Sequence, residues 1–313
     1  MKAMIDFDAA PIFGIAMTDA SGVREGMLIE GPQGWGEFSP PPDCDDRETS
    51  RWLTAAIEGG TVGWPDPRRG RIPIAVVVTA VDPEAARLTV EVSGCRTADV
   101  TVAATPDSLA EDVARVEAVR AGLGPEGRIR LSANGMWNVA GAVRAIAALS
   151  EAAGELEFVG QPCRTTDELA TVRRQVDVRI AAEVSSAEAV DVVILRSGPL
   201  GGVRRSLRVA ERLDIPCVVS SSNETSIGLA SGLALAGALP ELPYDCALGT
   251  VSVLTGDLVV ERRSLRPVDG HLPVAPTPPS PEPELVQRFA LTDVDKIDWW
   301  RRRLQSARTT VWS

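Results

Sequence analysis

The chain has 313 residues and a formal net charge of −11 at pH 7, with 44% hydrophobic and 24% charged residues. This length allows one large domain and a smaller one, and the composition is typical of a globular protein. The acidic balance leaves no basic stripe to neutralise phosphates, so we expect no nucleic-acid partner. No apolar run approaches the ~18 residues that a membrane span needs, so we expect no membrane partner.

The cysteines and the single histidine limit which metal, disulfide and catalytic sites the chain can form. Five cysteines are scattered along the chain without CxxC spacing, which is typical of buried thiols in a reducing cytoplasm and argues against disulfides or zinc. We therefore expect a cytoplasmic protein. The one histidine, His271, lies in a turn-like stretch, DGHLPVAP. Neither a Ser-His-Asp triad nor a multi-histidine metal site is expected from it.

The first 70 residues differ in composition from the rest of the chain. They are rich in glycine and proline and carry short apolar runs such as MLIEG and GWGEF, followed by the amphipathic stretch RETSRWLTAAIEGG. This pattern predicts a small α+β unit over residues 1–70, with two or three strands and one helix.

From residue 72, apolar runs rich in β-branched residues alternate with stretches of helical period. Strands are predicted at 72–81, 98–103, 128–133, 156–160, 178–183, 190–196, 215–222 and 245–250. Helices are predicted at 83–93, 107–121, 138–150, 165–175, 202–213 and 226–239. Eight strands with intervening helices indicate a parallel sheet, which closes most simply into a barrel over residues 71–255. An open doubly wound sheet is the alternative, but the chain carries no glycine-rich nucleotide fingerprint to support it.

One link in this series is unusually short. Only residues 184–189 separate the fifth and sixth predicted strands. Six residues span at most ~20 Å, and returning along a five-residue strand needs ~17 Å. The link can therefore close only as extended chain, and we predict that the fifth barrel helix is missing. A thin or distorted wall should lie beside the fifth and sixth strands.

The last part of the chain, residues 256–313, is expected to pack back on the barrel and the small unit. VSVLTG and DLVVERR resemble a further pair of strands, and the proline-rich connector PVAPTPPSPEPE is typical of extended surface chain. A terminal helix is predicted around DVDKIDWWRRRLQSA, with Trp299 and Trp300 packed against the folded body.

Several motifs together resemble the enolase superfamily, and in particular its actinobacterial o-succinylbenzoate synthases of menaquinone biosynthesis. The motifs are SANG-W, QPC, AAE-S, PLGGV and SSSNETSIGLA, and the likeness extends to GWGEFSPP, SGCRTA, LPELPY and WWRRRL. The resemblance implies an α/β fold, a (β/α)7β-type modified TIM barrel with an N-terminal α+β capping domain that C-terminal residues complete. It also implies three carboxylates that bind Mg²⁺ and two lysines, on the second and sixth strands, that flank the substrate.

The metal carboxylates of the family fall on Ser132, Gly160 and Glu183 in this chain. Two of the three acids are thereby absent. Because Mg²⁺ gives up its water reluctantly and one carboxylate does not hold it well, we expect no tight metal site and no cofactor. Without a cation the family's enediolate intermediate lacks stabilisation, so the family reaction should be lost or very slow.

The family's lysines are replaced as well. The second-strand KxK pattern falls on Asp99 and Thr101, and the sixth-strand lysine falls on Arg196. Arg196 keeps a positive charge but cannot serve as a base. A buried Asp99 needs a partner, and we expect Arg196 to supply it. The pair is either a stabilising core ion pair or, with Glu183, the polar end of a ligand pocket. As candidate catalytic residues we take Asp99, Thr101, Glu183 and Arg196.

Other residues are candidates for binding a substrate. The turn after the seventh strand offers hydroxyls and backbone N–H groups at a helix start, although plain helix capping explains it equally well. The small unit covers the barrel mouth in the family. The candidates are Phe13, Gly14, Ile15, Ser132, Asn134, Gly160, Gly201, Ser221, Ser222, Asn223, Glu224 and Thr225.

Three functions remain open. The first is a metal-independent enzyme, a cyclase or lyase that binds a small apolar or carboxylate-bearing organic molecule in the barrel mouth and promotes cyclisation, including pericyclic closure, or elimination. The second is a non-catalytic pseudoenzyme that binds a ligand or a protein partner. The third is a residual o-succinylbenzoate synthase. An open pocket favours the first, a mouth filled by side chains the second, and three converging metal ligands the third. The sequence leaves a homo-oligomer open.

Overall fold

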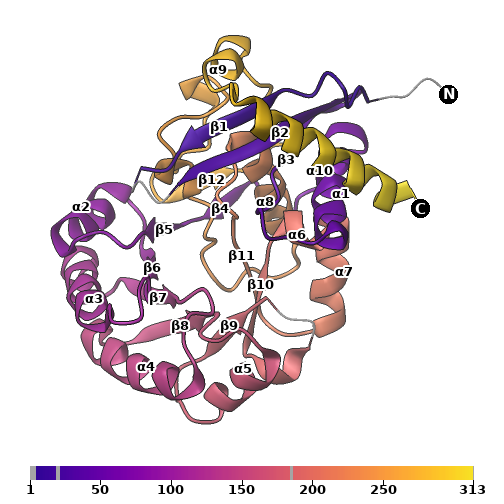
Figure 1. The fold of residues 1–313 in the computed structure, drawn as a ribbon. Helices are drawn as coiled ribbons and strands as arrows, with labels where there is room; N and C mark the ends of the chain where they lie inside the picture. Colours follow the sequence, from indigo (N-terminus) through magenta and orange to yellow (C-terminus); the bar gives the residue numbers. More distant parts are fainter. Residues whose placement is uncertain (1–4, 19–21, 184–185, 313) are drawn as a thin grey trace.

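The computed structural model describes residues 5–18, 22–183 and 186–312. A three-stranded antiparallel sheet in the order β1-β2-β3 forms the core of the small N-terminal unit, with β1 Ile12–Ala16, β2 Val23–Gly31 and β3 Gly34–Phe38. Helix α1, Asp46–Thr61, packs on this sheet. The strands and helix expected over residues 1–70 are therefore present (Figure 1).

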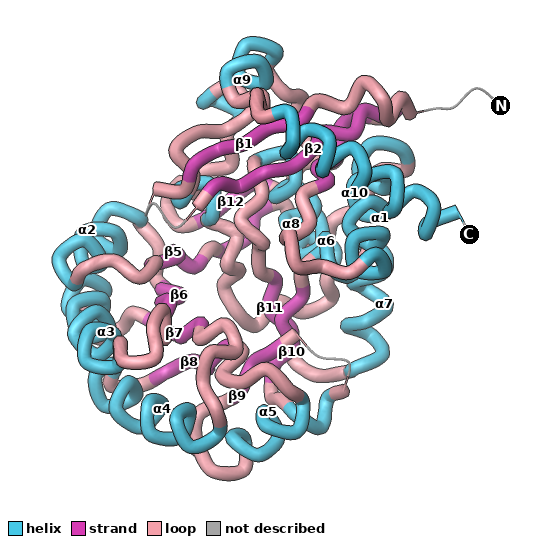
Figure 2. The backbone as a smooth tube through the Cα atoms, viewed as in Figure 1, coloured by secondary structure: helices cyan, strands magenta, loops and turns pink. Residues whose placement is uncertain are grey.

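Seven parallel strands form the second sheet. In chain order they are β5 Ala75–Val78, β6 Thr97–Thr101, β7 Arg128–Ser132, β8 Leu156–Gly160, β9 Ile180–Ala182, β10 Val192–Leu195 and β11 Cys217–Val219, and each pairs with the next. Bridges from Ile74 to Cys246 and from Ser220 to Ala247 join the two edges through an eighth extended segment. The sheet therefore curls round on itself, as the sequence predicts, and the open doubly wound alternative is excluded (Figure 2).

Helices cover the outside of this sheet (Figure 2). The β-branched and leucine side chains of the strands belong to the buried core beneath them. N-terminal caps determine where some of these helices begin. Asp82 accepts a hydrogen bond from the N–H of Ala85, and Thr165 forms a capping box with Glu168. The helices are α2 Pro83–Ser93, α3 Leu109–Leu123, α4 Val139–Ala153, α5 Thr166–Arg173, the short α6 Ser197–Leu200, α7 Val203–Leu213 and α8 Ser226–Ala238.

The fifth barrel helix is missing among the described residues, as predicted. The link between β9 and β10 contains a single 3₁₀ turn, η1 Ala187–Ala189, capped by the side chain of Ser186. The expectation of a fully extended link is wrong for these three residues, because Ser186 Oγ accepts from the N–H of Glu188 and starts a turn. Residues 184–185 lie outside the described part of the chain.

The segment after the barrel corrects another expectation. The stretches that resemble a strand pair are instead two 3₁₀ turns, η2 Thr250–Val253 and η3 Glu261–Arg263. Asp257 is buried between them and accepts hydrogen bonds from Ser226 and Ser264. The chain is therefore folded around the start of α8, where buried side-chain contacts override the strand-like pattern.

The two ends of the chain meet in the small unit. After the short helix α9, Pro283–Arg288, the terminal helix α10, Val294–Trp312, packs on α1. Trp300 is buried, lies edge-on to Phe38, and donates through Nε1 to Glu25 at 3.1 Å. Trp299 lies beside it. The prediction that these tryptophans pack back on the folded body is confirmed.

Three features complete the fold. Strand β4, Arg71–Pro73, pairs with β12, His271–Pro273, next to the first barrel strand.

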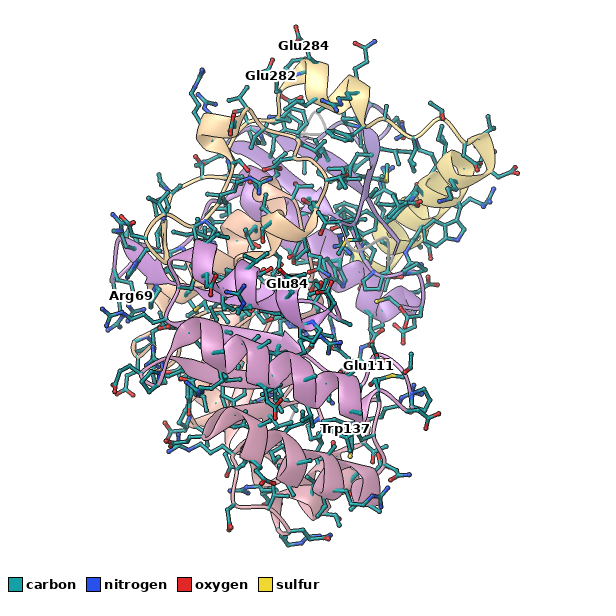
Figure 3. The ribbon with its side chains drawn as sticks, turned by 90° about the vertical axis from the view of Figure 1, so that its left-hand side faces the viewer. Arg69, Glu84, Glu111, Trp137, Glu282 and Glu284 are labelled. Atoms are coloured by element: carbon teal, nitrogen blue, oxygen red, sulfur yellow. The ribbon has the colours of Figure 1, made fainter. Side chains whose placement is uncertain are left out.

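In Figure 3, Glu111 and Trp137 lie near the starts of α3 and α4, away from Arg69, so the carboxyl ends of the strands face the side opposite Arg69. Among the helices that the structure describes, none has the length and apolar composition to cross a bilayer.

Candidate active site at the barrel mouth

A cavity of about 1190 Å³ opens at the carboxyl ends of the barrel strands and extends to the small unit. It is therefore an open pocket and not a mouth filled by side chains. Most of the barrel residues proposed from the sequence line it: Asp99, Thr101, Ser132, Asn134, Glu183, Arg196, Ser221, Ser222 and Asn223.

Asp99 lies at the floor of this cavity and is held by two neighbours. Its Oδ2 accepts from Nε of Arg130 at 2.9 Å, and its Oδ1 accepts from Oγ of Ser132 at 2.6 Å. The expected Asp99–Arg196 pair is wrong. Asp99 and Arg130 are register partners in β6 and β7, so the guanidinium reaches the carboxylate from the adjacent strand.

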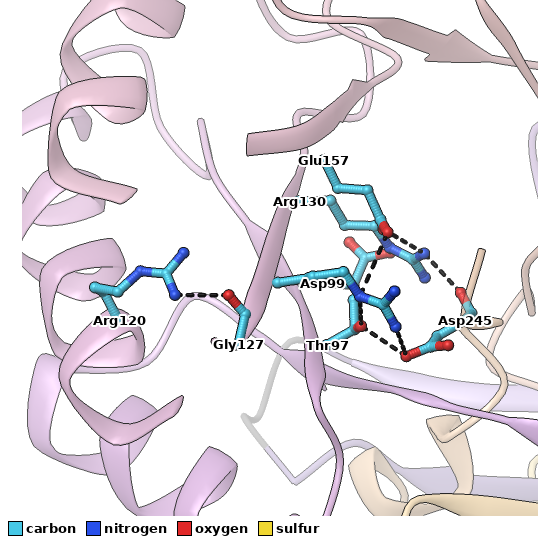
Figure 4. A network of polar contacts seen from close by, with 8 residues as sticks. Thr97, Asp99, Arg120, Gly127, Arg130, Glu157 and Asp245 are labelled. Carbon is cyan, nitrogen blue, oxygen red and sulfur yellow. Dashed lines mark hydrogen bonds and ion pairs between the residues drawn. The ribbon is translucent and has the colours of Figure 1, made fainter. Parts of the chain in front are cut away.

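Beneath the floor, charged side chains fill the barrel interior (Figure 4). Arg130 is fully buried, stacks on Phe158 at 5.0 Å, and lies within 3.6 Å of Glu157. Its Nη1 donates to the carbonyl of Asp245 at 2.6 Å. Burial raises the pKa of Glu157, and the charge of Arg130 opposes that rise. The hydrogen bonds from Arg130 and Ser132 hold Asp99 in one position above this layer.

The side wall carries a second ion pair. Nη1 of Arg196 lies 3.0 Å from Oε1 of Glu183, and about a third of each side chain is exposed to the cavity, 30% and 40%. Glu183 follows β9 directly, and Arg196 follows β10. Nε of Arg196 is buried with no hydrogen-bond partner among the described residues. A ligand can therefore contact only the other, exposed atoms of the Arg196 side chain.

A hydroxyl-rich turn, residues 220–223, follows β11. Ser221 Oγ donates to Glu224 and accepts from Thr250 Oγ1 at 2.7 Å. The N–H of Ser222 also donates to Glu224, while Oγ of Ser222 is buried without a partner among the described residues. Ser222 thus lines the cavity, but its hydroxyl oxygen is itself buried.

Several proposed binding residues lie elsewhere. Glu224 and Thr225 are buried beneath the turn, where Glu224 holds it in shape and Thr225 caps α8, so neither lines the cavity. Phe13 and Ile15 are core residues packed with Leu28, because β1 turns these side chains inward. The remaining three residues are outside the cavity lining as well: Gly14, Gly160 and Gly201.

The donor set does not fit a hard divalent cation. Ser132 Oγ is committed to Asp99, Gly160 has no side chain, and Glu183 is paired with Arg196. Across the described residues, no three side chains of histidine, cysteine, aspartate or glutamate converge to form a metal site. One carboxylate bound to an arginine is a poor ligand for Mg²⁺, which prefers two or more acids.

The site also contains residues that the sequence analysis missed. Arg130 is the most important of them, and strand alternation could have indicated it. Arg130 and Ser132 are two residues apart on one strand and therefore face the same side. From the small unit and α7, the cavity also receives Met17, Arg51 and Arg205. Their approach depends on how the two parts dock, which no local pattern encodes.

Comparison with known proteins identifies the class. A family model described as enolase C-terminal domain-like matches residues 80–279, and one described as enolase N-terminal domain-like matches residues 21–60. The chain belongs to the enolase superfamily. Solved structures agree on the fold. Muconate lactonizing enzyme from Pseudomonas fluorescens has a TM-score of 0.74 at 19% identity, covering 92% of this chain and 98% of that one.

Within the superfamily the chain is similar to o-succinylbenzoate synthases. It is 50% identical over 297 residues to the synthase of Thermobifida fusca (strain YX), covering 91% of this chain and 90% of the relative. It is 44% identical over 301 residues to that of Mycolicibacterium smegmatis (strain ATCC 700084 / mc(2)155), covering 92% and 91%. The family resemblance expected from the motifs is confirmed.

Proposed function

We propose that this protein is a metal-independent enzyme that binds a carboxylate-bearing organic molecule in the barrel mouth and promotes its cyclisation or elimination. One observation carries the proposal. The cavity is open, yet the side chains at the family's metal positions are engaged with protein partners and do not converge. A pocket that is kept open favours use by a small molecule, while its donor set favours chemistry without a divalent ion.

The cavity offers three kinds of group to such a molecule. Arg196, whose side chain is 30% exposed, supplies a positive charge for a carboxylate or a polarised carbonyl. Ser132, whose hydroxyl hydrogen is given to Asp99, presents oxygen lone pairs as acceptors. Apolar groups from β10, Val193 and Ile194, line the same space. Such a site can hold a flexible substrate in a reactive shape, which is the main demand of a ring closure.

The test combines metal removal with ligand binding. After treatment with EDTA and metal analysis, the purified protein is titrated with o-succinylbenzoate, with and without saturating Mg²⁺. We expect binding that is independent of Mg²⁺. Arg196→Met should weaken it roughly tenfold or more, because a charged hydrogen bond is lost. The matched control is Arg173→Met, which removes an ion pair with Asp191 outside the cavity and should leave binding unchanged.

A parallel assay decides between the proposal and a residual synthase, which the 50% identity to the Thermobifida fusca synthase supports. Such a synthase would dehydrate a cyclohexadiene carboxylate. With this substrate and saturating Mg²⁺, we expect turnover at least ~10³-fold below that of the relative, because the metal's electrostatic stabilisation is missing. Turnover at a comparable, Mg²⁺-dependent rate would overturn the proposal in favour of the synthase. Binding without any turnover across candidate cyclisation substrates would favour the pseudoenzyme.

A further inference from the structure

Gln161 follows β8 directly and is not among the residues that line the cavity. Its backbone is left-handed, with a φ of 45°, a conformation that glycine adopts readily and other residues seldom do. Such a conformation persists only where surrounding contacts hold it. At Gln161 four hydrogen bonds provide those contacts, two through the backbone and two through the side-chain amide.

The left-handed turn changes one rung of the ladder between β8 and β9. Gly160 is the register partner of Ala181, so Gln161 lies opposite Ala182. In a parallel ladder the N–H of Gln161 donates to the residue before its partner, and its carbonyl accepts from the residue after it. The first bond is present, to the Ala181 carbonyl at 2.7 Å. The carbonyl, however, accepts from the N–H of Gly135 at 2.6 Å.

The side chain of Gln161 takes the place of that carbonyl. Its Oε1 accepts from the N–H of Glu183 at 3.1 Å, and its Nε2 donates to the carbonyl of Cys163 at 2.9 Å. The bond to Cys163 fixes the orientation of the amide. Strand β9 has only three residues, and the described part of the link after it contains a single 3₁₀ turn in place of a helix. A side chain therefore holds Glu183 where a barrel strand is normally held by backbone.

Glu183 passes this placement on to Arg196. Its Oε1 lies 3.0 Å from Nη1 of Arg196, the charged group that the cavity offers to a ligand. A guanidinium binds a carboxylate best in one planar orientation, and a partner on one of its nitrogens restricts that orientation. We propose that Gln161 is a positioning residue, which holds the N–H of Glu183 and thereby keeps the Glu183–Arg196 pair in the geometry that binds a ligand's carboxylate. The inference rests on the proposed function, because it takes the barrel mouth as the binding site.

The first test is calorimetric titration with o-succinylbenzoate. Gln161→Met keeps the length of the side chain but removes the amide, and binding should weaken roughly fivefold to tenfold, the effect of about one net hydrogen bond. In a Glu183→Gln background the same change should have no further effect, because Gln161 acts through the Glu183 carboxylate. Gln161→Glu keeps an acceptor for the N–H of Glu183 but loses the donor to Cys163, so its affinity should fall between those of the wild type and Gln161→Met.

The matched control is the same substitution at Gln175. This residue is exposed just after α5, donates to the carbonyl of Thr171 and does not line the cavity. Gln175→Met should therefore bind o-succinylbenzoate as the wild type does. Circular dichroism checks that each variant is folded.

The second test uses nuclear magnetic resonance on the free protein. Nε of Arg196 is buried, so its N–H should exchange slowly with water and give a distinct signal, which Arg196→Met assigns. Gln161→Met should speed this exchange roughly tenfold or more by allowing the Glu183–Arg196 pair to open. Nε of Arg130, which is bonded to Asp99, should be unaffected.

Several results would overturn the inference. They are unchanged or tighter binding by Gln161→Met, an equal loss of affinity in the Glu183→Gln background, and an Arg196 signal that is unchanged or changes together with that of Arg130. The proposed function fails on different results, namely Mg²⁺-dependent synthase turnover or a wild type that does not bind o-succinylbenzoate. In that case the two arginine signals still decide whether Gln161 holds the pair.

Discussion

The contact between Asp99 and Arg130 decides how the cavity floor is built. A fully buried guanidinium is costly unless anions and acceptors surround it, and here Asp99, Glu157 and the Asp245 carbonyl provide them. Asp99 is itself 13% exposed, so it belongs both to this interior layer and to the cavity surface. Both interpretations left open for Asp99 assumed a pair with Arg196; that pair does not form, because Asp99 pairs with Arg130 and Arg196 with Glu183.

Removing either member of this pair should be strongly destabilising. We expect Asp99→Ala and Arg130→Met each to lower the free energy of unfolding by about 3–5 kcal/mol, because each leaves a charge without its partner. The double variant should cost less than the two together, by about 2 kcal/mol, since the two residues are in contact. Urea denaturation of the four proteins measures this coupling. Additive losses would show that the pair is not an energetic unit.

Glu37 should make stability depend on pH near neutrality. Its buried carboxyl group accepts from Ser39 Oγ and from the N–H and hydroxyl of Thr225. Burial raises its pKa to about 7, despite the opposing charge of Arg24. An unfolded glutamate titrates near 4.3, so the folded state binds this proton more tightly. The contribution to stability is complete below about pH 4.3 and is lost as pH rises to about 7.

The measurement compares the wild type with Glu37→Gln, which cannot titrate. Between pH 5 and pH 7 the free energy of unfolding of the wild type should fall relative to that of the variant, by about 2 kcal/mol. Parallel pH profiles of the two proteins would contradict this assignment. Using the difference removes the contributions of the other carboxyl groups.

At the scale of elements, the β3–α1 contact depends on glycine. A Cβ atom at Gly36 would lie 2.0 Å from the carbonyl oxygen of Ala56, so the strand and helix backbones touch directly. Gly36→Ala should therefore lower the free energy of unfolding by about 1–3 kcal/mol through overpacking. The matched control is Gly70→Ala, where no atom lies within 4 Å of the added methyl group, and stability should be unchanged or slightly higher. Thermal denaturation distinguishes the two.

Local patterns predicted most of these elements. Eight alternating runs and the short link at 184–189 were enough to anticipate a closed barrel without its fifth helix. The pattern failed at Thr250–Val253 and Glu261–Arg263, where apolar periodicity resembles strands but the chain forms 3₁₀ turns. There the hydrogen bonds of Asp257 determine the backbone path.

The candidate site was predicted less completely than the fold. Residues at the carboxyl ends of barrel strands, such as Thr101, Asn134 and Glu183, do line the cavity, because the barrel fixes where strand ends lie. The ion-pair partner of Asp99 was predicted wrongly. Both Arg130 and Arg196 are candidates by sequence, and only the strand register shows that Arg130 lies opposite Asp99. Phe13 and Ile15 were misplaced because docking of the small unit determines which of its faces is covered.

At the scale of the whole molecule, the small unit is completed by the end of the chain. Trp300 of α10 fills the space beside Phe38, and its indole donates to Glu25 of β2. Trp300→Ala should lower the free energy of unfolding by about 3–5 kcal/mol, through the cavity and the unpaired acceptor. On the same helix Trp312 is 61% exposed, so Trp312→Ala should cost far less. Equal losses in denaturant titrations would mean that α10 is not an integral part of this core.

The absent fifth helix has a kinetic consequence. Pairing β9 with β10 closes only residues 183–191, whereas pairing β6 with β7 closes residues 102–127. The shorter loop lowers the entropy cost of closure by about 1 kcal/mol. We therefore expect β9 and β10 to pair early in folding, before the other barrel strands. In pulse-labelled refolding, the amide of Asp191, bonded to the Ile180 carbonyl, should gain protection before that of Val102, bonded to Ser132. Simultaneous protection would place the rate-limiting event elsewhere. The missing surface helix would then speed the pairing of these two strands.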